Sequence, residues 1–136
     1  MANAMYDKGR NKFARGEIHW HVGGDNFRVY LVDGADYTVD LVNHEFLTSI
    51  LEAARVAFAD LTVIDPVGGV CDANDVGFGN VSGDPSEVLV ICKWSGADAT
   101  SPLVAYIDSA TGLPVTPNSG PINITWDDGA NKIFKL

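Results

Sequence analysis

Short stretches in which apolar and polar residues alternate, separated by turn-forming residues, constrain the fold of this chain most. Every second residue is apolar in 18–22, 27–31, 37–41 and 122–126. A period of two places the apolar side chains on one face of a half-buried β-strand. Gly, Asp, Asn and Pro gather between these stretches and favour tight turns. The pattern predicts a mainly β fold, either an antiparallel β-sandwich or a barrel.

Two other stretches, 88–92 and 103–107, are apolar almost throughout. A short continuous apolar run is typical of a strand that is covered on both faces. We therefore expect 88–92 to be a central strand, with 103–107 as the next strand along the chain. Cys92 lies in the first stretch, and neither it nor Cys71 belongs to a C-x-x-C pair. We expect both cysteines to be reduced, with Cys92 in the core.

A helix is predicted at the N-terminus, over residues 2–15, because Ala, Met, Lys and Arg favour helical structure. Asn3 is its expected N-cap, and Gly16 is expected to end it. One short internal helix is predicted over 44–53, where apolar residues recur at helical spacing. Residues 54–64 fit either an extension of that helix or a strand, and the pattern does not decide between them.

The net charge of −9 is unevenly distributed along the chain. Most of the surplus of carboxylates follows residue 15, so the body of the molecule repels phosphate backbones and is not expected to bind nucleic acid. The N-terminal residues are instead basic. Their cations are Lys8, Arg10, Lys12 and Arg15. They predict either an arm that contacts an acidic patch on a neighbouring subunit, or a solvated helix packed on its own domain through Tyr6 and Phe13.

The length of the chain fits one structural domain, 1–136, in which residues 1–15 form the helical arm. Neither an internal repeat nor a linker divides it. It contains no run of about 18 apolar residues, so no membrane-spanning segment and no membrane partner are expected. No apolar stretch follows the N-terminal charges, so a secretory signal is not expected.

Residue patterns that would hold a metal ion are incomplete. His19 and His21 share one face of an expected strand, but a zinc site needs more ligands at defined spacing. The Asp-rich loops 33–36, 72–75 and 127–131 do not match the calcium-binding loop, and Asp and Asn are common in turns. We predict no metal site and no cofactor.

Catalytic motifs are incomplete as well. His44 and Glu45 begin like the helix of a metalloprotease, but Thr48 stands where the second histidine is required. No nucleophile elbow, phosphate-binding loop or Cys–His pair is present. Because catalysis needs a convergent set of titratable groups, we predict no catalytic residue and no enzyme activity.

Several longer segments of the chain together resemble one known family. They are Met-Ala-Asn-Ala-Met-Tyr-Asp-Lys-Gly-Arg at 1–10, Ala-Asp-Tyr-Thr-Val-Asp-Leu at 35–41, Asn-His-Glu-Phe-Leu at 43–47, 103–118, and Ile-Thr-Trp-Asp-Asp-Gly-Ala-Asn-Lys-Ile-Phe-Lys-Leu at 124–136. The chain resembles a family of small virion-associated proteins encoded by tailed bacteriophages. The likeness is weakest over 54–100. It implies a virion structural protein and transfers no catalytic residue.

Within a virion, an acidic β domain of this size suits a capsid decoration or cement protein, which would bind the major capsid protein and form homo-oligomers around local symmetry axes. Trp20 and Trp94 are candidate interface anchors together with the four N-terminal cations, whereas Trp126 is expected in the core. One alternative is a tail, head–tail connector or fibre-base component. Another is a carbohydrate-binding module that stacks sugars on exposed Trp94 and Tyr106.

Overall fold

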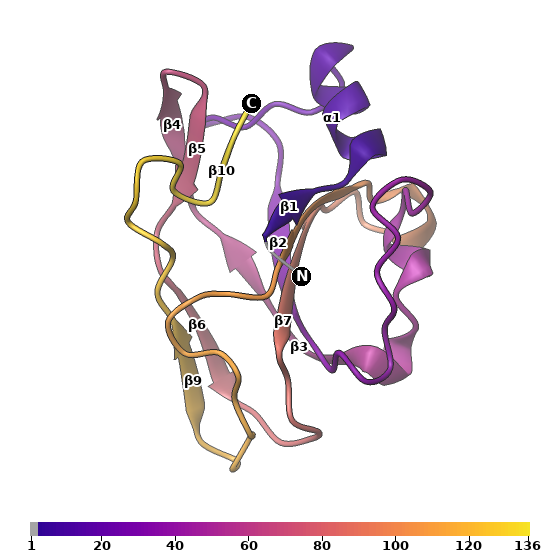
Figure 1. Cartoon of the computed structure of the whole chain (residues 1–136), viewed down its shortest axis with the longest axis vertical. Helices are drawn as coiled ribbons and strands as arrows, with labels where there is room; N and C mark the ends of the chain where they lie inside the picture. The colour runs from indigo at the N-terminus through magenta and orange to yellow at the C-terminus, as the bar shows by residue number, and fades with distance from the viewer. Residues whose placement is uncertain (1–2) are drawn as a thin grey trace.

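The computed structural model of the chain describes residues 3–136. Its strands are β1 (Ala4–Met5), β2 (Phe27–Val32), β3 (Arg55–Leu61), β4 (Val63–Val67), β5 (Val70–Ala73), β6 (Val76–Asn80), β7 (Val88–Lys93), β8 (Leu103–Ile107), β9 (Pro121–Ile124) and β10 (Phe134–Lys135). Its helical segments are α1 (Asp7–Ala14) and the short 3-10 turns η1 (Leu47–Ser49), η2 (Glu52–Ala54) and η3 (Asp98–Thr100). Figure 1 shows their arrangement.

The largest element is a five-stranded sheet in the order β1-β8-β7-β2-β3, in which every neighbouring pair is antiparallel. Strand β7 lies in the middle and is buried from Val88 to Cys92. The prediction of a central strand at 88–92 is therefore confirmed. Strand β8 follows it in the chain and pairs with it directly, as expected.

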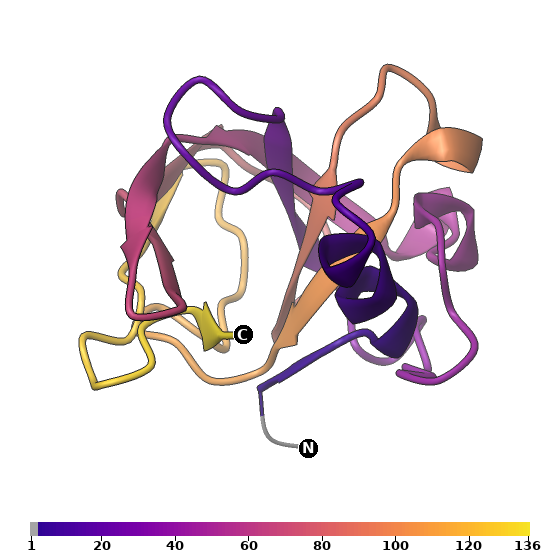
Figure 2. The same cartoon turned by 90° about the horizontal axis from the view of Figure 1, so that it is seen from above.

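Alternate residues of the central strands face two separate cores. Leu89 and Ile91 belong to a core shared with the two smaller sheets, β10-β5-β4 and β6-β9. Val88, Val90 and Cys92 face a second core. That side is covered by the start of α1 and by the irregular chain around η1 and η2, as Figure 2 shows from above. The continuous apolar run exists because both faces of β7 are covered.

The predicted mainly β, antiparallel fold with an N-terminal helix is confirmed. Over residues 3–136 the strands form three sheets and do not close into a barrel. The ambiguous segment 54–64 is mostly strand: after Ala54, which ends η2, β3 runs in the five-stranded sheet and, after Thr62, β4 runs in a smaller one. The chain from 55 to 67 thus contributes to two sheets.

Two predicted strands do not form. Residues 18–22 are irregular, although Ile18 and Trp20 are buried as their alternation suggested. The Trp20 indole packs on Phe27 at 4.5 Å between ring centroids and donates to the Asp72 carbonyl, so the segment covers the edge of a core without a partner strand. Residues 37–41 likewise form no strand and lie across the second core.

The turn-forming residues 127–131 favour a C-terminal hairpin between 122–126 and 133–136, and this prediction is wrong. Strand β10 pairs with β5, whereas β9 pairs with β6. The internal helix predicted at 44–53 is present only as the separate 3-10 turns η1 and η2, which the extended Ile50 and Leu51 divide.

Helix α1 is shorter than predicted because Ala4 and Met5 pair with β8 as an edge strand. Residue 2 of the predicted range lies outside the described residues. Asn3 is not the N-cap: its side chain bonds the backbone of Asp108 and Ser109. Gly9 permits the close approach of α1 to β8, since a side chain there would clash with the Leu103 carbonyl. Residues 3–15 are therefore part of the body and not a projecting arm.

No helix among residues 3–136 is long and apolar enough to cross a membrane.

Candidate functional site

The cations of the predicted arm make contacts within the chain. Lys12 is buried, its ammonium lies 3.0 Å from Glu45 and stacks over the Phe46 ring, and Lys8 reaches the same carboxylate at 3.7 Å. The hydrogen bond from Lys12 lowers the pKa of Glu45. These contacts fix the loop before η1 onto α1.

Arg15 and Arg10 differ in their surroundings. Arg15 pairs with Glu17 at 2.5 Å on the surface. Arg10 is exposed and makes no ion pair among the described residues. Of the four predicted cations, Arg10 alone keeps its side chain unpaired within the described chain.

The three tryptophans differ in how far they are buried. Trp20 is only 4% exposed and belongs to the core, so this chain does not present it as a surface anchor. Trp126 is buried, as expected, and donates its indole N–H to the Asn74 carbonyl. Trp94 is half-buried at the end of β7. Tyr106 is buried in the second core, so the exposed pair of Trp94 and Tyr106 that a sugar would need does not form.

Trp94 instead belongs to a stack that the sequence did not indicate. The Arg28 guanidinium lies 3.9 Å from the Trp94 ring centroid and 4.2 Å from that of Phe58. Strand register explains the arrangement: Arg28 on β2 faces Asp60 on β3, and Tyr30 faces Phe58. A cation between two rings is stabilised by both π-faces.

The stack occupies the half of the second sheet face that the irregular chain leaves open. Phe58 is 54% exposed and Asp60 is 81% exposed, whereas the Arg28 side chain is 19% exposed. Arg28 donates to Asp60 over 3.3 Å and to the Tyr30 hydroxyl over 3.5 Å. Burial acts to lower the pKa of Arg28, but these two bonds and the charge interactions with Tyr30 and Asp60 together outweigh burial and raise it. We call Arg28, Phe58, Asp60 and Trp94 the open aromatic surface.

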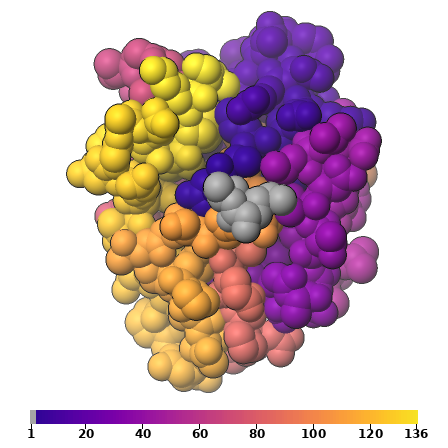
Figure 3. Space-filling view, in the orientation of Figure 1, coloured from indigo at the N-terminus to yellow at the C-terminus, as the bar shows by residue number. Residues whose placement is uncertain are grey.

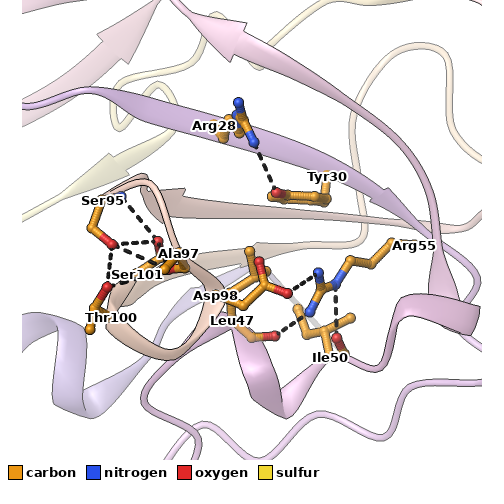
Figure 4. Close-up of polar contacts among 10 residues, drawn as sticks. All are labelled: Arg28, Tyr30, Leu47, Ile50, Arg55, Ser95, Ala97, Asp98, Thr100 and Ser101. Carbon is orange, nitrogen blue, oxygen red and sulfur yellow. Dashed lines mark hydrogen bonds and ion pairs between the residues drawn. The ribbon is translucent and has the colours of Figure 1, made fainter.

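A second arginine closes the other half of the same face (Figure 4). Arg55 donates to the carbonyls of Leu47 and Ile50 at 2.9 and 2.8 Å and pairs with Asp98 at 2.8 Å. It thereby ties η1, η2 and the loop 95–101 to β3. Within that loop, hydroxyl groups of Ser95, Thr100 and Ser101 bond one another and the Ala97 carbonyl. The loop that borders the open aromatic surface is therefore internally fixed.

Among residues 3–136, His19 and His21 do not come together with a third ligand that could hold a metal ion. His19 lies 3.3 Å from Asp25, and its ring is 6.4 Å from that of His21, on irregular chain. Elsewhere, carboxylate oxygens of Asp33, Asp36 and Asp84 lie within 4.8 Å of one another. Asp33 accepts the Ala35 N–H in a local turn, and we assign no function to this group.

Both cysteines are buried and free, as predicted. Burial raises the pKa of the Cys71 thiol to about 11 and that of Cys92 to about 12. The Cys92 thiol stays protonated at neutral pH although two arginines lower its pKa against the effect of burial.

Comparison with models of known protein families gives no match, and comparison with curated proteins gives no significant relative.

Proposed function

We propose that this chain is a structural protein of a tailed-bacteriophage virion, a capsid decoration protein that docks onto the major capsid protein through its open aromatic surface. The family resemblance supports the virion, and the surface supports docking. The protein works by burying surface across the shell, so that separation of neighbouring shell subunits must break additional contacts.

The observation that carries this proposal is the stack of Arg28 between Phe58 and Trp94 on an uncovered sheet face. Trp, Tyr and Arg are the residue types that contribute most binding energy at protein interfaces. A guanidinium has five N–H donors, and Arg28 uses two of them in long bonds. The remaining donors can bond acceptors of a partner, while the rings exclude water around them.

The area that a stable contact requires indicates that residues next to the open aromatic surface also take part. A stable interface buries about 800 Å² on each partner, against 6717 Å² of exposed surface on this chain. Four residues are too few for this area. The fixed loop 95–101 borders the surface and is expected to complete the contact.

The test uses purified phage particles that lack this protein. Wild-type protein is added, particles are sedimented, and bound protein is quantified and then located by cryo-electron microscopy. We expect saturable binding at equivalent shell sites, and we expect Phe58→Asp or Trp94→Ala to reduce it at least about tenfold. Val42→Asp is the matched control, because Val42 is equally apolar and exposed but lies outside the surface.

Three results would contradict the proposal. Binding at the tail would support the tail or connector alternative. Unchanged binding of Phe58→Asp would remove the open aromatic surface as the dock. Absence of the protein from every particle would remove the virion role.

A further inference from the structure

The cations of this chain are almost all paired internally. Seven of the nine Lys and Arg residues make ion pairs with carboxylates of the chain. Among the described residues, the two without such a pair are Arg10 and Lys135. The chain has twice as many carboxylates as cations, so these two unpaired cations are exceptions among its basic residues.

Both unpaired cations line the same groove. It lies between α1 and the C-terminal residues, which are neighbours at one end of the molecule (Figures 1 and 3). Its volume is about 420 Å³, and Arg10, Phe13, Ala14, Lys135 and Leu136 line it. We call it the terminal groove.

The floor of the terminal groove is apolar. Phe13 packs on Phe134 with ring centroids 5.8 Å apart and is half-buried, and Leu136 is 58% exposed. An adjoining cavity of about 330 Å³ shares Arg10 and Lys135, and its lining also contains Asp127 and Lys132, which pairs with Asp128. The groove therefore offers apolar contact between two free positive charges, which fits a surface that presents carboxylates beside an apolar side chain.

A second copy of this chain carries such a surface on β4, where exposed Asp65 lies between the exposed Ile64 and Val67. Among residues 3–136, six of the eighteen Asp and Glu residues pair with Lys or Arg, and the other carboxylates face solvent or make other contacts. No Asp or Glu lines the terminal groove itself. The groove of one copy therefore does not complement the same groove of another, and a contact between copies has to join it to a different, acidic face.

We propose that the terminal groove binds an acidic face of a second copy of this chain, so that copies associate head-to-tail into a ring. A repeated head-to-tail contact closes into a ring when its rotation divides a full turn, and otherwise continues as a filament. In this contact the positively charged terminal groove of one copy faces a negatively charged face of the next copy. The contact is separate from the open aromatic surface. It stands independently of the virion role.

The test is self-association of the purified full chain, measured by sedimentation velocity over a range of concentrations and at low and high salt. We expect a closed oligomer of more than two copies whose dissociation constant rises with salt. The double variant Arg10→Glu with Lys135→Glu is expected to raise that constant at least about tenfold. Lys8→Glu with Arg15→Glu is the control, because it changes net charge equally on α1 but outside the groove lining.

A second measurement does not depend on the variants. Acetylation of Lys135 by a water-soluble ester, read by mass spectrometry, is expected to slow when the oligomer forms, whereas that of Lys8 is not. A chain that stays monomeric, a two-fold dimer, or an oligomer indifferent to the groove variants would each overturn the proposal. If the chain stays monomeric and the groove variants no longer bind particles, the groove binds the shell protein and not a second copy.

Discussion

Two arginines on the same face of one sheet have opposite roles. Arg55 makes three bonds of 2.8 to 2.9 Å to chain that covers the sheet, and its side chain is 12% exposed. Arg28 makes two bonds of 3.3 and 3.5 Å and lies between two rings. Both contact Tyr30. The difference indicates that an arginine stabilises the fold when its donors are used and remains available for a partner when they are not.

The largest expected effect is on Arg55. Arg55→Ala leaves the carbonyls of Leu47 and Ile50 and the Asp98 carboxylate without their donor, so we expect a loss of about 3 kcal/mol in the free energy of unfolding. Urea denaturation followed by circular dichroism measures it. Arg55→Lys is the control, because it keeps the charge but not the fork of donors. A loss below about 1 kcal/mol would abolish the distinction between the two arginines.

The next largest effect is a loss of stability at alkaline pH, and it involves Cys92, whose thiol interacts with the charges of both arginines. Its pKa is about 12 in the folded chain, against an ordinary value of 9.0. Between these values the unfolded chain has released the proton and the folded chain has kept it, so stability present below pH 9 is lost as pH rises. The slope is at most about 1.4 kcal/mol per pH unit for one proton.

The measurement compares urea midpoints of wild type and Cys92→Ala at pH 8, 10 and 11. The difference between the two proteins should shrink as pH rises, since the variant lacks the titrating thiol. The raised pKa of Tyr37 affects both proteins alike and cancels. Parallel curves would mean that water reaches Cys92 from the open half of the face.

A smaller effect is expected at Arg28. Arg28→Ala removes two ring contacts and two long bonds, and we expect it to cost about 1 kcal/mol or less. The same variant should lose particle binding in the sedimentation assay. A cost equal to that of Arg55→Ala would show that Arg28 also belongs to the fixed half.

The smallest effect on stability is expected at Phe58. Phe58→Asp removes one ring contact with Arg28 from a side chain that is 54% exposed, so we expect a loss of about 0.5 kcal/mol in the free energy of unfolding. Thermal melting is sufficient to check it. A large loss would mean that the ring supports the sheet and that its exposure does not mark a dock.

The local sequence pattern predicted a strand correctly where the prediction did not depend on which strand pairs with it. The apolar run 88–92 had to be covered on both faces, wherever its neighbours came from. The alternation at 18–22 placed Ile18 and Trp20 inside correctly, yet a strand also needs a free edge to pair with, and the sequence does not contain that information. The prediction of a C-terminal hairpin failed for the same reason, because β10 pairs with β5 and not with β9.

The candidate surfaces were predictable only in part. Trp94 was expected near the surface because it ends an apolar strand. Arg28 and Phe58 gave no local indication, since register across β2 and β3 brings them together. Arg10 was one of four equivalent cations by sequence, and the positions of Glu45 beside Lys8 and Lys12 and of Glu17 beside Arg15 distinguish it.

The chain from 55 to 67, shared by β3 and β4, has a mechanical consequence. Its covalent backbone passes directly from the five-stranded sheet to a smaller one, so neither sheet can slide along the other without stretching this connection. Tension applied through Phe58 is transmitted along the polypeptide to the β4–β5 hairpin, and not only through side-chain packing. The sheets are therefore expected to move as a stiff pair.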